Sequence, residues 1–123
     1  MLLNKLFTIL SQEAAPGNLK CTIALNQGHE IFSGHFPGLP VLPGVCMVQM
    51  VKEILQCVQP GRHDLASADN IKFLAVLNPA EHDQIHVMLN YVVNPSGFIN
   101  VQASLFAGTV TFLKMKATFK PAA

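Results

Sequence analysis

The stretch "GHFPGLPVLPGV", residues 34–45, combines residue types that could do chemistry. It holds His35, three prolines at three-residue spacing and, at its end, Gly44 ahead of an apolar run. Proline fixes φ and pushes the preceding residue toward an extended conformation, so the segment predicts a stiff, polyproline-like ribbon. Such a ribbon would hold His35 in place and lose little entropy when a ligand binds.

Gly44 and Val45 lie where the following helix is expected to begin. The free N–H groups and the positive dipole end of a helix N-terminus suit an oxyanion or a polarised carbonyl. A histidine base, a rigid platform and an amide donor together suit removal of a proton next to a carbonyl group. The alternative from these residues alone is a loop that needs prolines to turn and a histidine that caps it.

Residues 45–59 show the periodicity of a helix that is buried on most of its surface, because every position outside one stripe is apolar. The polar stripe recurs at spacings of three and four and consists of Gln49, Lys52, Glu53, Gln56 and Gln59. Pro60 and Gly61 are expected to end this helix. The chain therefore presents a polar stripe directly after the histidine ribbon.

The rest of the chain predicts a short amphipathic helix followed mostly by strands. The helix would cover residues 1–15, and a β-prone stretch around Ile31 and Phe32 would pair back on the first strand. Strands are expected at 19–26, 70–76, 83–93, 98–107 and 109–120. This order of elements belongs to the α+β class, within a single domain of residues 1–123.

The last predicted strand changes its apolar phase between Phe112 and Leu113. A strand cannot keep one face buried across such a change unless a bulge intervenes or both faces are covered. We therefore predict a bulge or a sheet crossing near Phe112. A curved antiparallel sheet wrapped around one long apolar helix would satisfy the whole pattern.

The composition narrows the classes of partner. Half of the 123 residues are hydrophobic and 12% are charged, which excludes disorder and predicts an oligomer that covers part of its apolar surface. A net charge of +1 gives no electrostatic case for nucleic acid or for an anionic membrane. The only basic cluster, Lys114, Lys116 and Lys120, alternates with apolar residues and is interpreted as the solvent face of a strand.

The cysteines and the remaining histidines give no sign of a metal or cofactor. Cys21, Cys46 and Cys57 are odd in number and form no CxxC pair, so we interpret them as reduced core thiols of a cytoplasmic protein. The first residues lack the pattern of a signal peptide, and no apolar stretch approaches the roughly 20 residues of a membrane span. His63, His82 and His86 lack metal-ligand spacing and are interpreted as surface or satisfied polar residues.

The stretch "GHFPGLPVLPGV" resembles the signature of the β-hydroxyacyl-acyl-carrier-protein dehydratases. The resemblance extends to "NQGHEIF" before it and "NIKFLAVLNPAEHDQIHVML" after it, and so covers most of the chain from about residue 20. It implies the hot-dog fold, in which a curved antiparallel sheet wraps around one long central helix and two chains pair into a dimer. This expectation agrees with the element order inferred from the residues.

The resemblance also implies roles for particular residues. His35 would remove the proton from C2 of a 3-hydroxyacyl thioester, carried by acyl-carrier protein or coenzyme A, and the amide of Gly44 would polarise the thioester carbonyl. A carboxylic acid on the central helix would protonate the departing hydroxyl. Since the histidine and the acid come from different subunits, the site would be built across a dimer. Phe36, Val41 and Leu42 could line an acyl tunnel or equally belong to the dimer core.

The chain departs from this pattern because Gln49 stands where the acid is expected. A carboxamide has no dissociable proton near neutral pH, although it can hydrogen-bond a hydroxyl or orient a water. Glu53, one turn on, is a possible substitute acid, but one turn displaces it by about 5 to 6 Å. We favour a solvent-exposed Glu53 beside Lys52. His29 could also approach the site from the neighbouring predicted strand.

Three functions stay open on the sequence. The first is a 3-hydroxyacyl thioester dehydratase or hydratase of fatty-acid or related lipid or polyketide biosynthesis, with His35 as base and Gln49 holding the hydroxyl or a water. The second is a catalytically impaired hot-dog subunit that binds acyl chains or pairs with a homologue supplying the missing acid. The third is an acyl thioesterase, since the same fold hosts hydrolysis; it would need Glu53, or a water held by Gln49, to attack the thioester carbonyl.

Overall fold

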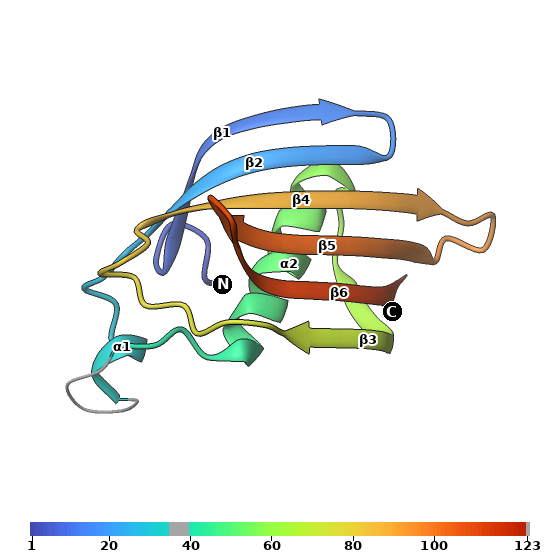
Figure 1. The fold of residues 1–123 in the computed structure, drawn as a ribbon. Coiled ribbons are helices and arrows are strands. Elements are labelled where there is room, and N and C mark those ends of the chain that lie inside the picture. Colours follow the sequence, from blue (N-terminus) through green and yellow to red (C-terminus); the bar gives the residue numbers. More distant parts are fainter. Residues whose placement is uncertain (35–39, 123) are drawn as a thin grey trace.

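An antiparallel sheet of six strands lies across one helix of 15 residues (Figure 1). The computed structural model describes residues 1–34 and 40–122. In chain order the elements are β1 (Phe7–Ala15), β2 (Asn18–Leu25), α1 (Ile31–Gly34), α2 (Gly44–Val58), β3 (His63–Phe73), β4 (Gln84–Val93), β5 (Ile99–Ala107) and β6 (Val110–Pro121). The strand order is β1-β2-β4-β5-β6-β3, so β1 and β3 form the two edges. The α+β prediction is confirmed.

The core lies between α2 and the inner face of the sheet. In β4, Ile85, Val87 and Leu89 are buried and alternate with less buried residues, as expected for a strand that presents one face to a core. These residues join Met50 and Ile54 of α2 in one continuous apolar cluster. The predicted helix of residues 45–59 is confirmed to within one residue at each end. None of the described helices is long and apolar enough to span a bilayer.

The predicted bulge near Phe112 is present in β6. Leu113 pairs with Leu105 of β5, whereas Thr111 pairs with Phe106, so Phe112 is the extra residue on its strand. The bulge allows Phe112 and Leu113, which are neighbours in sequence, to be fully buried together. Beyond it the strand alternates regularly, and the three lysines 114, 116 and 120 are exposed as predicted.

The predicted helix over residues 1–15 is wrong, because residues 7–15 form the edge strand β1. Pro16 and Gly17, interpreted as a helix end, instead connect β1 to β2 in a hairpin whose last pair joins Ala15 to Asn18. Gly17 has φ of 72°, a conformation that glycine adopts without strain. Pairing with β2 therefore overrides the local helical pattern, and β1 needs little burial because it lies at the sheet edge.

The predicted β-prone pairing around Ile31 and Phe32 is also wrong, because these residues begin the short helix α1. The backbone N–H of Ile31 donates to Nδ1 of His29 at 3.0 Å, and the N–H of Gly28 donates to the side-chain oxygen of Asn26 at 3.0 Å. Such local bonds from side chain to backbone favour turns over a sheet ladder. Phe32 is nevertheless buried in the core.

The three cysteines are free thiols, but only Cys21 and Cys46 are buried. The prediction of a core position is wrong for Cys57, which is exposed on α2. Burial raises the pKa of the Cys21 thiol to about 11, with a smaller contribution from Cys57. Partial burial also raises the pKa of Cys57, and the nearby Glu53 adds to that rise. These shifts keep the thiols protonated near neutral pH and therefore weakly nucleophilic.

Candidate functional site

Two of the residues predicted for the site, His35 and Phe36, lie outside the described ranges 1–34 and 40–122. The chain is described up to Gly34, at the end of α1, and again from Pro40 onward. The placement of the predicted base therefore stays a prediction. The other candidate residues, Val41, Leu42, Gly44, Gln49 and Glu53, are all described.

Residues 40–43 lead directly into the N-terminus of α2. Pro43 is extended, with φ of −61° and ψ of 143°, and its carbonyl accepts hydrogen bonds from the N–H groups of Cys46 and Met47. Just before it, the N–H of Leu42 donates to the carbonyl of Leu77 at 2.9 Å. Pro43 is the N-cap residue and makes no side-chain hydrogen bond to the helix. Gly44 begins the first turn, and its amide lies at the positive end of the helix dipole.

Phe73 at the end of β3 packs directly against Gly44. A Cβ atom added to Gly44 would lie 2.7, 2.8 and 3.1 Å from three carbon atoms of the Phe73 ring. Glycine therefore allows the close approach of the aromatic ring to the start of α2, and a larger residue would have to displace the end of the Phe73 side chain. Phe73 is 53% exposed, so its side chain has room to move away from Gly44.

Gly44→Ala is expected to lower the free energy of unfolding by about 1 kcal/mol, because the new methyl group displaces the Phe73 ring. In a Phe73→Ala background the same substitution should be neutral or slightly stabilising, since alanine is the better helix former. Urea unfolding of the four proteins of this double-mutant cycle measures the coupling. Equal effects of Gly44→Ala in both backgrounds would contradict the contact.

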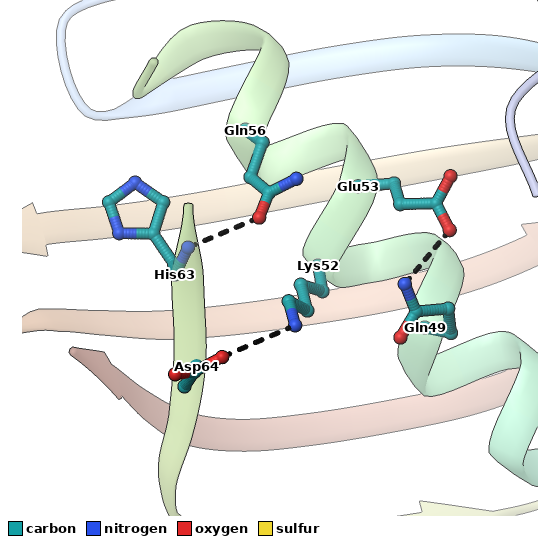
Figure 2. Close-up of polar contacts among 6 residues, drawn as sticks. All are labelled: Gln49, Lys52, Glu53, Gln56, His63 and Asp64. Atoms are coloured by element: carbon teal, nitrogen blue, oxygen red, sulfur yellow. Dashed lines mark hydrogen bonds and ion pairs between the residues drawn. The ribbon is translucent and has the colours of Figure 1, made fainter. Parts of the chain in front are cut away.

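Glu53 lies at the centre of a buried polar cluster that ties α2 to the first residues of the chain. Its Oε1 atom accepts hydrogen bonds from the N–H groups of Leu2 at 2.9 Å and Leu3 at 2.8 Å, and Oε2 lies 3.0 Å from the N–H of Leu2. Oε2 also accepts a hydrogen bond of 2.9 Å from Nε2 of Gln49 (Figure 2). Buried carboxylates need such partners to offset the loss of water.

The expectation of a solvent-exposed Glu53 is wrong, because only 2% of the residue is accessible. Its neighbour Lys52 points the other way along the stripe and reaches Asp64 of β3, with Nζ 3.7 Å from Oδ1 (Figure 2). The polar stripe of α2 is thus divided between two surroundings. The hydrogen-bond donors that allow Glu53 to be buried are backbone amides of residues 2 and 3. Every residue except proline has such an amide, so residue types do not reveal these partners in the sequence.

The residues proposed for an acyl tunnel differ in their surroundings. Leu42 is almost fully buried within the core cluster, whereas Val41 is partly exposed. Two surface hollows, of about 440 and 350 Å³, include the exposed side chains of Asn90, Gln102 and Lys116. These side chains alternate with the core residues of their strands, so the hollows lie on the sheet face opposite α2. They do not involve Gly44, Gln49 or Glu53.

The described histidines occupy separate places. His29 is held in the turn before α1, and the ring of His63 is buried with Nε2 2.9 Å from the carbonyl of Gln59. His82 contacts the ring of Phe112 edge-on, and His86 lies 3.1 Å from the hydroxyl of Thr22 on the outer sheet face. Over residues 1–34 and 40–122, no group of three histidine, cysteine or acidic side chains could hold a metal ion.

Exposed apolar residues gather near the start of α2 and the end of the edge strand β3. Val45 is 76% exposed and Val76 is 68% exposed, and Phe73 and Leu74 are each about half exposed. On one side β3 pairs with β6, while its other edge has no strand partner among the described residues. An open strand edge flanked by exposed apolar residues is typical of a surface that another chain covers.

Residues 11–106 match the model of the ApeI-like family, described as ApeI dehydratase. The chain is 28% identical over 108 residues to the 3-hydroxyacyl-[acyl-carrier-protein] dehydratase FabZ of Lactobacillus helveticus, covering 81% of this chain and 73% of that relative. It is 31% identical over 97 residues to the FabZ of Bartonella bacilliformis, covering 72% of this chain and 60% of that relative.

Solved structures of low identity share the fold. A chain of the dehydratase heterocomplex ApeI:P from Xenorhabdus doucetiae superposes with a TM-score of 0.73 at 23% identity, covering 92% of this chain and 96% of that one. Thioesterase superfamily member 2 from Mus musculus superposes with a TM-score of 0.60 at 19% identity, covering 92% and 80%. The hot-dog fold is thereby confirmed, with its antiparallel sheet of six strands, but α2 has only 15 residues and does not show the long central helix that the sequence predicts. Since it includes a thioesterase, the fold alone does not select the reaction.

Proposed function

The chain belongs to the ApeI-like dehydratase family, and on that premise we propose that it dehydrates 3-hydroxyacyl thioesters in the cytoplasm, within fatty-acid or related lipid or polyketide biosynthesis. The observation that carries the proposal is the sequence from His35 to Pro43, directly ahead of the N-terminus of α2, in a chain whose curated relatives are 3-hydroxyacyl-[acyl-carrier-protein] dehydratases. The carrier would be acyl-carrier protein, as in the names of those relatives, with coenzyme A as the alternative.

In the proposed reaction His35 removes the proton at C2 of the substrate. The negative charge that develops on the thioester oxygen is stabilised by the amide of Gly44 at the positive end of the α2 dipole. The hydroxyl at C3 leaves as water once it has received a proton. Gln49 holds this hydroxyl, or a water beside it, but cannot itself supply the proton.

Glu53 is poorly placed to supply that proton. Both of its oxygens accept hydrogen bonds from N–H donors, and the residue is buried. The proton therefore comes from a water held by Gln49 or from a group of a second subunit. General acid catalysis contributes about 10² to 10⁴-fold, so turnover should be slow when a water replaces it.

The site is proposed to be completed in a dimer. The open edge of β3 and the exposed side chains of Val45, Phe73 and Leu74 lie close to Gly44, so a second chain covering them would also border the site. This partner is another copy of the chain in the simplest case. A tunnel for the acyl chain would then run past Phe36 and Val41 between the two subunits, while Leu42 lies in the core of its own chain.

A heterodimer with a related hot-dog subunit is the second candidate, favoured by two observations. Gln49 lacks the acid that the reaction needs, and the chain shares its fold with a subunit of a dehydratase heterocomplex. In that arrangement the partner's helix would bring an acid to His35 of this chain. The purified chain alone would then be inactive and would gain activity when the partner is added.

The test is an assay of the purified chain with a 3-hydroxyacyl thioester on acyl-carrier protein and, separately, on coenzyme A. Loss of water is followed by mass and release of free thiol is followed in the same tube. Loss of water without thiol release supports the proposed dehydratase. Thiol release would instead identify a thioesterase, and silence in both readings, reversed by a related subunit, would support the heterodimer.

A further inference from the structure

We propose that Glu53 is a positioning residue, whose carboxylate fixes the carboxamide of Gln49 with its oxygen turned outward to accept a hydrogen bond from a hydroxyl group. The inference rests on the proposed function of the same site and assigns a role to a residue that need not touch the substrate. It identifies the ligand group at Gln49 as a hydrogen-bond donor, either the C3 hydroxyl of the thioester or a water beside it.

The contact between the two side chains determines which end of the carboxamide faces which way. A carboxylate oxygen accepts hydrogen bonds, and of the two polar atoms of Gln49 only Nε2 can donate. The distance of 2.9 Å from Nε2 to Oε2 of Glu53 therefore assigns the nitrogen to the Glu53 side. Figure 2 shows the oxygen of Gln49 turned away from Glu53. That oxygen is the acceptor left over for a ligand.

Glu53 is itself held by the backbone, in addition to its contact with Gln49. The N–H groups of Leu2 and Leu3 both point at its carboxylate, and backbone donors cannot rotate away as side chains can. Only 2% of the residue is accessible, so water does not compete for its oxygens. The orientation of Gln49 is thus fixed through a chain of contacts that begins at the backbone of residues 2 and 3.

The inference explains why an acid and an amide stand one turn apart on α2 in this order. If position 53 also carried a glutamine, its carboxamide oxygen would have to accept the hydrogen bonds from the N–H groups of Leu2 and Leu3. Its nitrogen would then face Gln49. Gln49 would have to turn over to accept that bond, and its nitrogen would face outward. Glu53 is the residue type that takes donors on both sides.

Glu53→Gln tests this reasoning with a side chain of nearly the same shape. The variant should keep its fold, but the carboxamide of Gln49 should turn over. Its N–H group would then face the C3 hydroxyl of the thioester, where an acceptor is needed. We expect kcat/KM for water loss to fall on the order of 10²-fold, the scale expected when a site group is misplaced. Glu81→Gln, which removes an exposed carboxylate in the turn before β4, is the matched control and should leave kcat/KM unchanged.

A spectroscopic reading separates the inference from the proposed function. In ¹H–¹⁵N spectra, one side-chain N–H of Gln49, assigned by its disappearance in Gln49→Met, should be shifted downfield and protected from exchange. This signature should vanish in Glu53→Gln and persist in Glu81→Gln. An unshifted, rapidly exchanging Gln49 amide in the wild type would overturn the inference whatever the activity. A protected amide in a chain inactive toward every thioester, alone or with a related subunit, would uphold the orientation and overturn the proposed function.

A double variant provides the rescue. In Gln49→Glu/Glu53→Gln, the inner carboxamide accepts from the Leu2 and Leu3 amides and donates outward to the new carboxylate, so every donor again meets an acceptor. Gln49→Glu alone places two carboxylates one turn apart and should unfold at lower temperature than the double variant. A double variant no more stable than Gln49→Glu would contradict the pairing.

Discussion

Replacement of His35 by alanine is expected to reduce water loss from a 3-hydroxyacyl thioester by at least about 10² to 10⁴-fold, the usual contribution of a general base. The reason is that His35 is the residue assigned to remove the C2 proton, and the ribbon around it has no second base. Its prolines would hold the imidazole at one position, so a water in the cavity left by alanine would be a weak substitute. Steady-state turnover, followed by mass, measures the loss.

His86→Ala is the matched control for this prediction. His86 is exposed on the outer face of the sheet, where it contacts Thr22 and Phe106, so its removal should leave kcat and KM close to those of the wild type. Equal activity of wild type and His35→Ala would remove His35 from the mechanism. Equal losses in both variants would point to general destabilisation, which circular dichroism would detect.

Phe112→Ala is expected to lower the free energy of unfolding by about 3 to 5 kcal/mol. Phe112 is the bulged residue of β6, fully buried, and its ring meets the edge of His82. Truncation leaves a cavity beneath the bulge that the neighbouring strand β5 cannot fill without losing its register. Since domains of this size are stable by about 5 to 15 kcal/mol, this single change removes a large part of the total.

The comparison with Phe98→Ala makes this prediction specific. Phe98 precedes β5 and is 39% exposed, so its truncation should cost much less than that of Phe112. Urea or thermal unfolding of the two variants under identical conditions gives the difference directly. A Phe112→Ala variant as stable as Phe98→Ala would mean that the bulge does not bury the ring as described.

The elements that could be predicted from sequence were those whose pattern is local and strong. The polar residues from Gln49 to Gln59 recur with a helical period in an otherwise apolar segment, and the change of phase at Phe112 and Leu113 has few solutions other than a bulge. The first 15 residues could not be predicted, because their apolar spacing also fits a helix and only pairing with β2 selects the strand β1. The stability of a strand depends on its neighbours in the sheet, which are far away in the sequence and are not visible in a short stretch of it.

The candidate site was predictable only in part for the same reason. The spacing of Gln49 and Glu53 places them on one helix face, and the structure joins them by a hydrogen bond. The hydrogen bonds that Glu53 accepts in its buried position come from the backbone of Leu2 and Leu3, about 50 residues away, and the aromatic ring against Gly44 comes from Phe73. These contacts arise from how the chain packs. The relation to the dehydratase family indicates the type of reaction, and the packing of the chain determines which atom of the Gln49 carboxamide is available to a ligand.

Deuterium incorporation at C2 of the substrate is the measurement that tests the central claim most directly. The wild-type chain, alone or with a related subunit, is incubated in heavy water with a 3-hydroxyacyl thioester, and the mass of the recovered acyl chain is read over time. Reversible removal of the C2 proton by His35 predicts uptake of one deuterium at C2 in the wild type and none in His35→Ala. A wild-type chain that leaves C2 unlabelled in every combination would contradict a dehydratase site in this protein.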